Sequence, residues 1–139
     1  MIVYGLVIMP NHIHLVFEIP SEVKHPEKVQ HSFMSYTAHE FRKKMDVVNE
    51  DQLFNYLVNA KDRKFQFWER NPKIITISDF NMAGDIINYI HCNPLQSKWS
   101  LVKFPEEYRY SSAEYYINGS NDFGMLRHYM EYFERKVRL

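Results

Sequence analysis

Near its start the chain reads Leu6-Val7-Ile8-Met9-Pro10-Asn11-His12-Ile13-His14-Leu15-Val16-Phe17, two apolar runs separated by a Pro-Asn pair. Apolar and β-branched runs on either side of turn-forming residues are typical of a β-hairpin. We therefore predict a strand over residues 2–9, a turn at 10–11 and a second strand over 12–19, which ends before Pro20.

The second predicted strand carries two histidines separated by one residue. Successive side chains of a strand point to opposite faces, so His12 and His14 share one face while Ile13 and Leu15 point into the core. Imidazole is a common ligand of zinc, manganese and iron, and such a pair needs only one or two further ligands. The alternative is an amphipathic strand whose exposed face happens to hold two histidines.

The composition is that of a globular protein, with 45% hydrophobic and 24% charged residues in 139. This length fits a single domain spanning residues 1–139. No apolar run approaches the ~18 to 20 residues of a membrane helix, and no basic leader precedes the apolar start. The one cysteine, Cys92, excludes an internal disulfide and suits a reducing compartment. We expect a cytoplasmic protein without a membrane partner.

Basic and aromatic residues alternate in the middle of the chain, although the formal net charge is zero. Cations that pair with phosphates, set beside rings on which bases stack, are the ingredients of single-strand binding. We take Arg63, Lys64 and Arg70 as candidate phosphate contacts, and Trp68 as a residue for stacking or, in preference, for packing. The alternative is a solvated charged surface.

Periodicity and capping residues predict helices along the rest of the chain. One helix is expected from residue 27 or 32 to 45, after a connection over 21–30, and a short one within 47–60. Short strands are expected over 64–68 and 73–77. Ser78 is the predicted N-cap of a helix that ends before Pro94, a short helix starts at 111–113, and an amphipathic segment covers 123–135.

The helix predicted from Ser78 has a polar face opposite its apolar stripe. Positions four apart place Asp85, Tyr89 and Asn93 together on it. Tyr89 is expected to face a cleft or solvent, and Asn93 to lie at a frayed helix end, where its amide oxygen is available to a ligand. The alternative for Tyr89 is a packing residue.

Two motifs in this order resemble a known family. Met9-Pro10-Asn11-His12-Ile13-His14-Leu15, followed by Asn88-Tyr89-Ile90-His91-Cys92-Asn93-Pro94-Leu95, is similar to the HUH-class single-strand transposases, especially the REP-associated tyrosine transposases. Phe67-Trp68-Glu69-Arg70 and Tyr110-Ser111-Ser112 look like further landmarks of that family.

The resemblance implies an α+β fold in which helices flank an antiparallel, ferredoxin-like sheet. It makes His12 and His14 the ligands of a divalent ion, Mg²⁺ or Mn²⁺, and Tyr89 the nucleophile. Asn93 takes the position of a third polar ligand. His91 is its rival, but lies about 200° around the helix from Tyr89. Two imidazoles favour the softer Mn²⁺.

The implied activity is that of a transposase, a single-stranded DNA endonuclease and strand transferase that forms a 5′-phosphotyrosine. Its partner is single-stranded or hairpin DNA. Relatives usually have another strand and a helix ahead of the histidine motif, whereas eight residues precede Met9 here. We therefore expect an open sheet edge, which favours a homodimer.

Two alternative functions stay open at this point. One is a degenerate relative that binds structured single-stranded DNA without cutting it. The other is a metal-dependent hydrolase in which His12, His14 and Asp85 hold Zn²⁺ and activate water. Replacing Tyr89 by Phe separates them, because only the transposase needs its hydroxyl.

Overall fold

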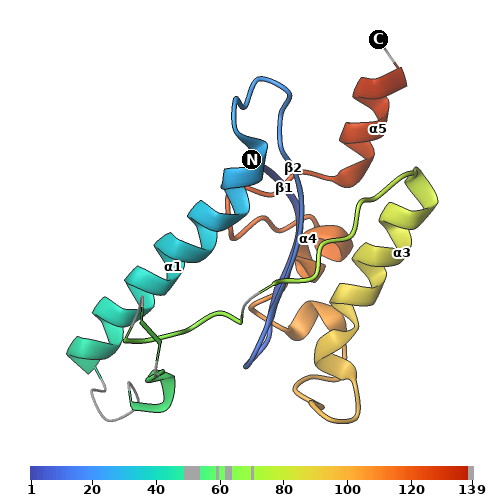
Figure 1. Cartoon of the computed structure of the whole chain (residues 1–139). Coiled ribbons are helices and arrows are strands. Elements are labelled where there is room, and N and C mark those ends of the chain that lie inside the picture. The colour runs from blue at the N-terminus through green and yellow to red at the C-terminus, as the bar shows by residue number, and fades with distance from the viewer. Residues whose placement is uncertain (49–53, 59, 62–63, 70, 138–139) are drawn as a thin grey trace. The chain divides into compact units, whose positions relative to one another are not determined.

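The computed structural model describes residues 1–48, 54–58, 60–61, 64–69 and 71–137 (Figure 1). Its contacts divide the chain into two units. Met1–Ser21 with Thr76–Leu139 form the hairpin unit, and Glu22–Ile75 form the helical unit.

The hairpin unit is built on two antiparallel strands, β1 (Ile2–Ile8) and β2 (Ile13–Glu18). The predicted hairpin is therefore confirmed, with strands one residue shorter at the turn. The backbone N–H of Met9 donates to the His12 carbonyl at 2.8 Å, so the turn takes up residues 9–12. His12 lies in this turn and His14 in β2. The α+β class is confirmed, and these are the two strands that the described residues form.

A β-bulge lets β1 bury both of its faces. Val3 pairs with Phe17 and Gly5 with Val16, which leaves Tyr4 as the extra residue. An extra residue shifts the alternation of side chains by one position. Tyr4 and Val7 consequently pack in one apolar cluster, and Val3 and Leu6 pack in another.

Helix α3 (Phe80–His91) covers the first face of the hairpin (Figure 1). Ile87 and Ile90 pack there against Tyr4, Val7 and Val16. The Ile87 side chain reaches so close to β1 that a Cβ atom on Gly5 would collide with its Cδ1. Glycine at this position leaves room for the ends of the Ile87 and Ile90 side chains between α3 and β1.

The N-cap of α3 is Asp79, so the prediction of Ser78 was wrong by one residue. The Asp79 carboxylate accepts the N–H of Met82 at 3.0 Å, and the Ser78 hydroxyl donates to that carboxylate at 2.7 Å. Asp79 has extended backbone angles, as an N-cap residue should. A charged acceptor also suits the positive end of a helix better than a hydroxyl.

The second face of the hairpin is covered by α4 (Ala113–Asn118) and the loop that follows it. Leu126 packs there on Val3 and Leu6, and forms an isolated bridge with Val3. Leu126 pairs with Val3, and Gly124 has a φ of 67°, which is outside the helical range. Helix α5 (Tyr129–Val137) therefore begins later than the predicted residue 123. Short 3₁₀ turns occupy Asn93–Leu95 and Pro105–Glu107.

The outer edge of β1 is paired by segments of the same unit. Ile8 N–H donates to the Tyr110 carbonyl at 2.8 Å, and Ser112 N–H to the Leu6 carbonyl at 2.8 Å. Arg127 N–H donates to the Val3 carbonyl at 3.0 Å. The open edge expected from the sequence is therefore not on this side of β1.

In the helical unit, α1 runs over Pro26–Val48, so the helix begins at a proline within the predicted connection 21–30. Proline is well suited to the first helical position, because its missing N–H has no partner there anyway. Although α1 has 23 residues, it is polar, and no described helix is both long and apolar enough to cross a bilayer.

Two predicted strands of the chain do not form. Residues 64–68 make only an isolated bridge between Phe65 and Leu57, next to a 3₁₀ turn over Phe54–Tyr56. Residues 73–77 have no strand partner among the described residues, and the Ile74 and Ile75 side chains are exposed. Strand propensity alone does not make a strand without a neighbour to pair with.

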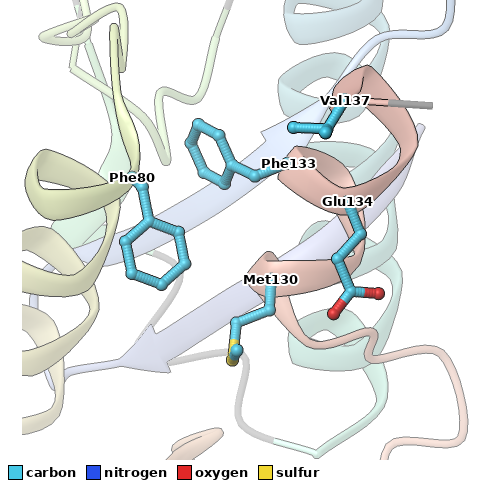
Figure 2. A pocket seen from close by; sticks show the side chains of 5 residues that line it. All are labelled: Phe80, Met130, Phe133, Glu134 and Val137. Carbon is cyan, nitrogen blue, oxygen red and sulfur yellow. The ribbon is translucent and has the colours of Figure 1, made fainter. Parts of the chain in front are cut away.

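An apolar hollow of about 300 Å³ lies between α5 and the start of α3 (Figure 2). Phe80 from α3 lines it with Met130, Phe133, Glu134 and Val137 from α5. Tyr89 lies nine residues further along α3, about 14 Å along the helix axis. The hollow is therefore separate from the site described below.

The Gly5→Val substitution tests the packing of α3 on β1. We expect it to lower the free energy of unfolding by about 1–3 kcal/mol, because the branched side chain collides with Ile87. Ile8→Val, at an exposed position of the same strand, is the control and should change it by less than about 0.5 kcal/mol. Urea denaturation measures both, and equal effects would contradict the close approach.

Candidate functional site

Three predicted site residues form a row of rings in the hairpin unit. The rings of His12 and His14 meet edge to face with centroids 4.9 Å apart. The ring of Tyr89 lies 5.8 Å from that of His14, also edge to face. The row results from packing α3 on the hairpin face that carries His14, because Ile87 and Ile90 fix the rotation of the helix. Residues some 75 positions apart are thus brought together.

One ring nitrogen of His12 is hydrogen bonded to Asn11, and the other can bind a metal ion. Its Nδ1 lies 2.6 Å from Oδ1 of Asn11, and an amide oxygen can only accept, so Nδ1 carries the proton. The lone pair is then on Nε2. A hydrogen bond to one nitrogen that orients the other is the usual arrangement around a metal-binding imidazole.

His14 is half-buried, and its Nε2 is buried without a hydrogen-bond partner among the described residues. Burial lowers the pKa of His14, the neighbouring His12 lowers it further, and the Asn93 amide acts in the opposite direction. The pKa of His12 is lowered mainly by burial and secondly by the Lys98 charge. Both shifts favour the neutral imidazole, which is the form that binds metals.

Asn93 lies beside His14, but it is not at a frayed helix end as predicted. It is only 3% exposed, and its Nδ2 donates to the Tyr89 carbonyl at 3.0 Å. Its Oδ1 accepts from Nε2 of Gln96 at 3.4 Å. Because Pro94 forces the chain into a 3₁₀ turn, the amide closes the end of α3 instead of fraying. An amide oxygen has two lone pairs, so Oδ1 can accept a second interaction.

Tyr89 is 56% exposed, so its hydroxyl is open to a large substrate. Asp85, one turn earlier on α3, is exposed as well. Among the described residues no three His, Cys, Asp or Glu side chains are grouped so as to hold a metal. Asp85 therefore does not complete a zinc set with His12 and His14, and the hydrolase alternative loses its third ligand.

His91 is turned away from the histidine pair into the core. Its Nε2 lies 2.8 Å from the Ser112 hydroxyl, whose oxygen also accepts the Leu6 N–H at 2.9 Å. A hydroxyl has one hydrogen and two lone pairs, so the Ser112 hydroxyl either donates to Nε2 of His91 or accepts from it. This position explains why His91 is the weaker candidate for the third ligand.

Sequence reasoning missed Lys98 and Trp99 at the end of the row. The Trp99 ring lies 6.0 Å from the His12 ring, and Nζ of Lys98 lies 5.2 Å above the Trp99 ring. A cation followed by an aromatic residue, directly after the Asn93-Pro94 turn, was the available signal. Periodicity could not detect it, because the segment is irregular.

The predicted DNA contacts belong to the helical unit. Arg63 and Arg70 lie outside the described residues. Lys64 is exposed, with Nζ 5.4 Å above the Phe65 ring. Trp68 donates from Nε1 to the Thr37 hydroxyl at 2.9 Å, and its ring lies 5.8 Å from the Phe41 ring, so it packs on α1 within the helical unit.

The donor set fits a divalent ion that accepts imidazole. It offers the oriented Nε2 of His12, the unpartnered Nε2 of His14 and the Oδ1 of Asn93. Two nitrogens and one amide oxygen suit Mn²⁺ better than Mg²⁺, which prefers oxygen ligands alone. A buried nitrogen without a partner costs about 1–3 kcal/mol, which a bound ion would offset.

Comparisons with protein-family models, curated proteins and solved structures find no match to this chain. The resemblance to the transposases consequently rests on the two motifs, and the function proposed below rests on those motifs together with the site geometry.

The burial of His91 predicts a pH-dependent stability. Burial lowers its pKa from 6.5 to about 4, so the unfolded chain binds the proton more tightly than the folded one. The contribution of the neutral His91 imidazole to the free energy of unfolding is complete above pH 6.5 and is lost as the pH falls towards 4. Between pH 7 and about pH 4.5, His91→Gln should lose about 2 kcal/mol less unfolding free energy than the wild-type chain, as measured by urea denaturation. An unchanged pH dependence would contradict the burial of a neutral imidazole.

Proposed function

We propose that this chain is a single-stranded DNA endonuclease and strand transferase of the HUH tyrosine transposase class. One observation carries the proposal: Tyr89 stands exposed beside the His12–His14 pair, with its ring 5.8 Å from that of His14. A nucleophile next to an ion-binding pair is what transfer of a phosphoryl group to a side chain requires. The ferredoxin-like sheet of that class and the homodimer belong to the same proposal.

The reaction is an exchange of one phosphoester for another. The Tyr89 Oη attacks the phosphorus of a DNA backbone phosphate in line with the departing 3′ oxygen. The bond between phosphorus and Oη forms as the bond to the 3′ oxygen breaks, and the proton lost by the phenol is balanced by protonation of that oxygen. The products are a 5′-phosphotyrosine and a free 3′-hydroxyl. Attack by a new 3′-hydroxyl reverses the step and joins strands without ATP.

The rest of the site prepares this attack. His12, His14 and Asn93 would hold the divalent ion, which when bound supplies positive charge against the phosphate oxygens. Asn11 orients the His12 ring through its Nδ1, and Gln96 holds the Asn93 amide. Since phenols ionise near a pKa of ~10, Tyr89 depends on such preparation at neutral pH.

The substrate is single-stranded or hairpin DNA. Tyr89 projects from a helix and is exposed, so the phosphate must be brought to it, which a bendable single strand permits more easily than a duplex. Lys64, together with Arg63 and Arg70, is proposed to contact phosphates. We assign Trp68 to packing on α1, because its Nε1 donates to the Thr37 hydroxyl.

Tyr89→Phe should abolish formation of a covalent protein–DNA adduct. The assay uses a labelled hairpin oligonucleotide from the DNA that flanks the protein's own gene, with Mn²⁺ or with EDTA, followed by denaturing electrophoresis. Tyr110→Phe is the matched control, because Tyr110 is also 56% exposed and lies in the same unit. The control should keep the adduct, since a loss of one hydroxyl elsewhere leaves the reacting atoms in place.

The same assay separates the alternatives. An adduct that persists in Tyr89→Phe would overturn the assignment of the nucleophile. Binding without an adduct in the wild-type chain would favour a degenerate DNA-binding relative, and metal-dependent cleavage without an adduct would favour a hydrolase.

Mn²⁺ should raise the melting temperature of the wild-type chain and not that of His14→Gln. An ion that binds only the folded state stabilises it by about 2.7 kcal/mol at a hundredfold excess over its dissociation constant. His25→Gln, which removes an exposed histidine of the helical unit, is the control and should keep the full shift. Equal shifts in all three proteins would contradict the metal site.

A further inference from the structure

Lys98 and Trp99 are held by a compact series of turns directly after α3. Trp99 N–H and Ser100 N–H both donate to the Gln96 carbonyl at 2.8 Å, and Leu101 N–H donates to the Pro94 carbonyl at 2.9 Å. Ser100 has a φ of 44°, a left-handed conformation that non-glycine residues rarely adopt. The Trp99 ring packs against the apolar cluster under α3. The backbone thus places these two side chains firmly beside His12.

The Lys98 ammonium has no carboxylate partner among the described residues. Its Nζ lies 5.2 Å from the centroid of the Trp99 ring. The aromatic face attracts the cation without neutralising it. Lys98 therefore presents a full positive charge at the histidine end of the row, and that charge acts on His12.

A fixed cation at this position has an electrostatic cost. It repels a divalent ion bound by His12 and His14, and it disfavours any positive charge on the imidazoles. An anion bound between the Lys98 ammonium and the divalent ion would attract both of them. A DNA strand brings such anions at regular spacing, one phosphate per nucleotide.

We propose that Lys98 binds a backbone phosphate of the single-stranded substrate next to the phosphate attacked by Tyr89, and that Trp99 positions the Lys98 ammonium for this contact. The inference rests on the proposed function and adds a substrate-binding group to the same site. Lys98 would set which phosphate of the strand reaches Tyr89, because it fixes the neighbouring one.

The test compares Lys98→Gln with Lys136→Gln. Lys136 is a matched control, because its Nζ lies 5.3 Å above the Tyr132 ring. It belongs to α5, which packs against the start of α3, whereas Lys98 follows the end of α3 (Figure 1). Each variant removes one positive charge and one contact with an aromatic ring. Binding of a single-stranded oligonucleotide is measured by fluorescence anisotropy in EDTA at several NaCl concentrations.

We expect Lys98→Gln to weaken binding about tenfold and to reduce the slope of log affinity against log salt by about 0.7, the value for one phosphate contact to a single strand. Lys98→Arg should retain most of the affinity. Lys136→Gln should leave both quantities unchanged. Mn²⁺ binding in the absence of DNA should be equal or tighter in Lys98→Gln, since a repelling charge is removed.

Three results would overturn the inference. Equal salt slopes in the two Gln variants, while the wild-type chain still forms its Mn²⁺-dependent adduct, would reject the Lys98 contact and leave the proposed function standing. Weaker Mn²⁺ binding in Lys98→Gln would show that Lys98 acts through the histidines. A wild-type chain that neither binds single-stranded DNA nor forms an adduct would overturn both the inference and the proposed function.

Discussion

The close approach of α3 to β1 at Gly5 is the contact on which the site depends. With no side chain at Gly5, Ile87 and Ile90 descend onto Tyr4, Val7 and Val16, and each buried isoleucine contributes about 2 kcal/mol. This packing fixes both the height and the rotation of the helix. Tyr89 thereby faces away from the core and towards His14, although the two residues lie in distant parts of the sequence.

Buried polar contacts hold the same arrangement from below. The Ser112 hydroxyl joins the Leu6 N–H of β1 to His91 of α3, so one side chain connects the strand, the helix and the start of α4. At the end of α3 the Asn93 amide bonds the Tyr89 carbonyl. The residues around Tyr89 thus divide between holding the helix and shaping the site, and His91 belongs to the first group.

The sequence predicts what depends on local pattern. The hairpin follows from the two apolar runs on either side of Pro10-Asn11, and α3 follows from its apolar stripe. The His12–His14 pair was predicted from the period of a strand, whereas the structure places His12 in the turn and His14 in β2. Contacts between distant parts of the chain could not be predicted from local pattern. These are the pairing of residues 110–112 with β1 and the lack of strand partners for residues 64–68 and 73–77. Asn93 was wrongly predicted at a frayed helix end, and Lys98 was not predicted as a site residue. Both positions depend on a turn that periodicity does not describe.

The most direct measurement is to digest the covalent adduct and locate the nucleotide by mass spectrometry. The chain has ten tyrosines, and several besides Tyr89 are exposed, so the modified residue discriminates between them. The account predicts the nucleotide on Tyr89, through a 5′-phosphate and only with a divalent ion. Modification of another residue, or no adduct with Mn²⁺ and hairpin DNA, would contradict it.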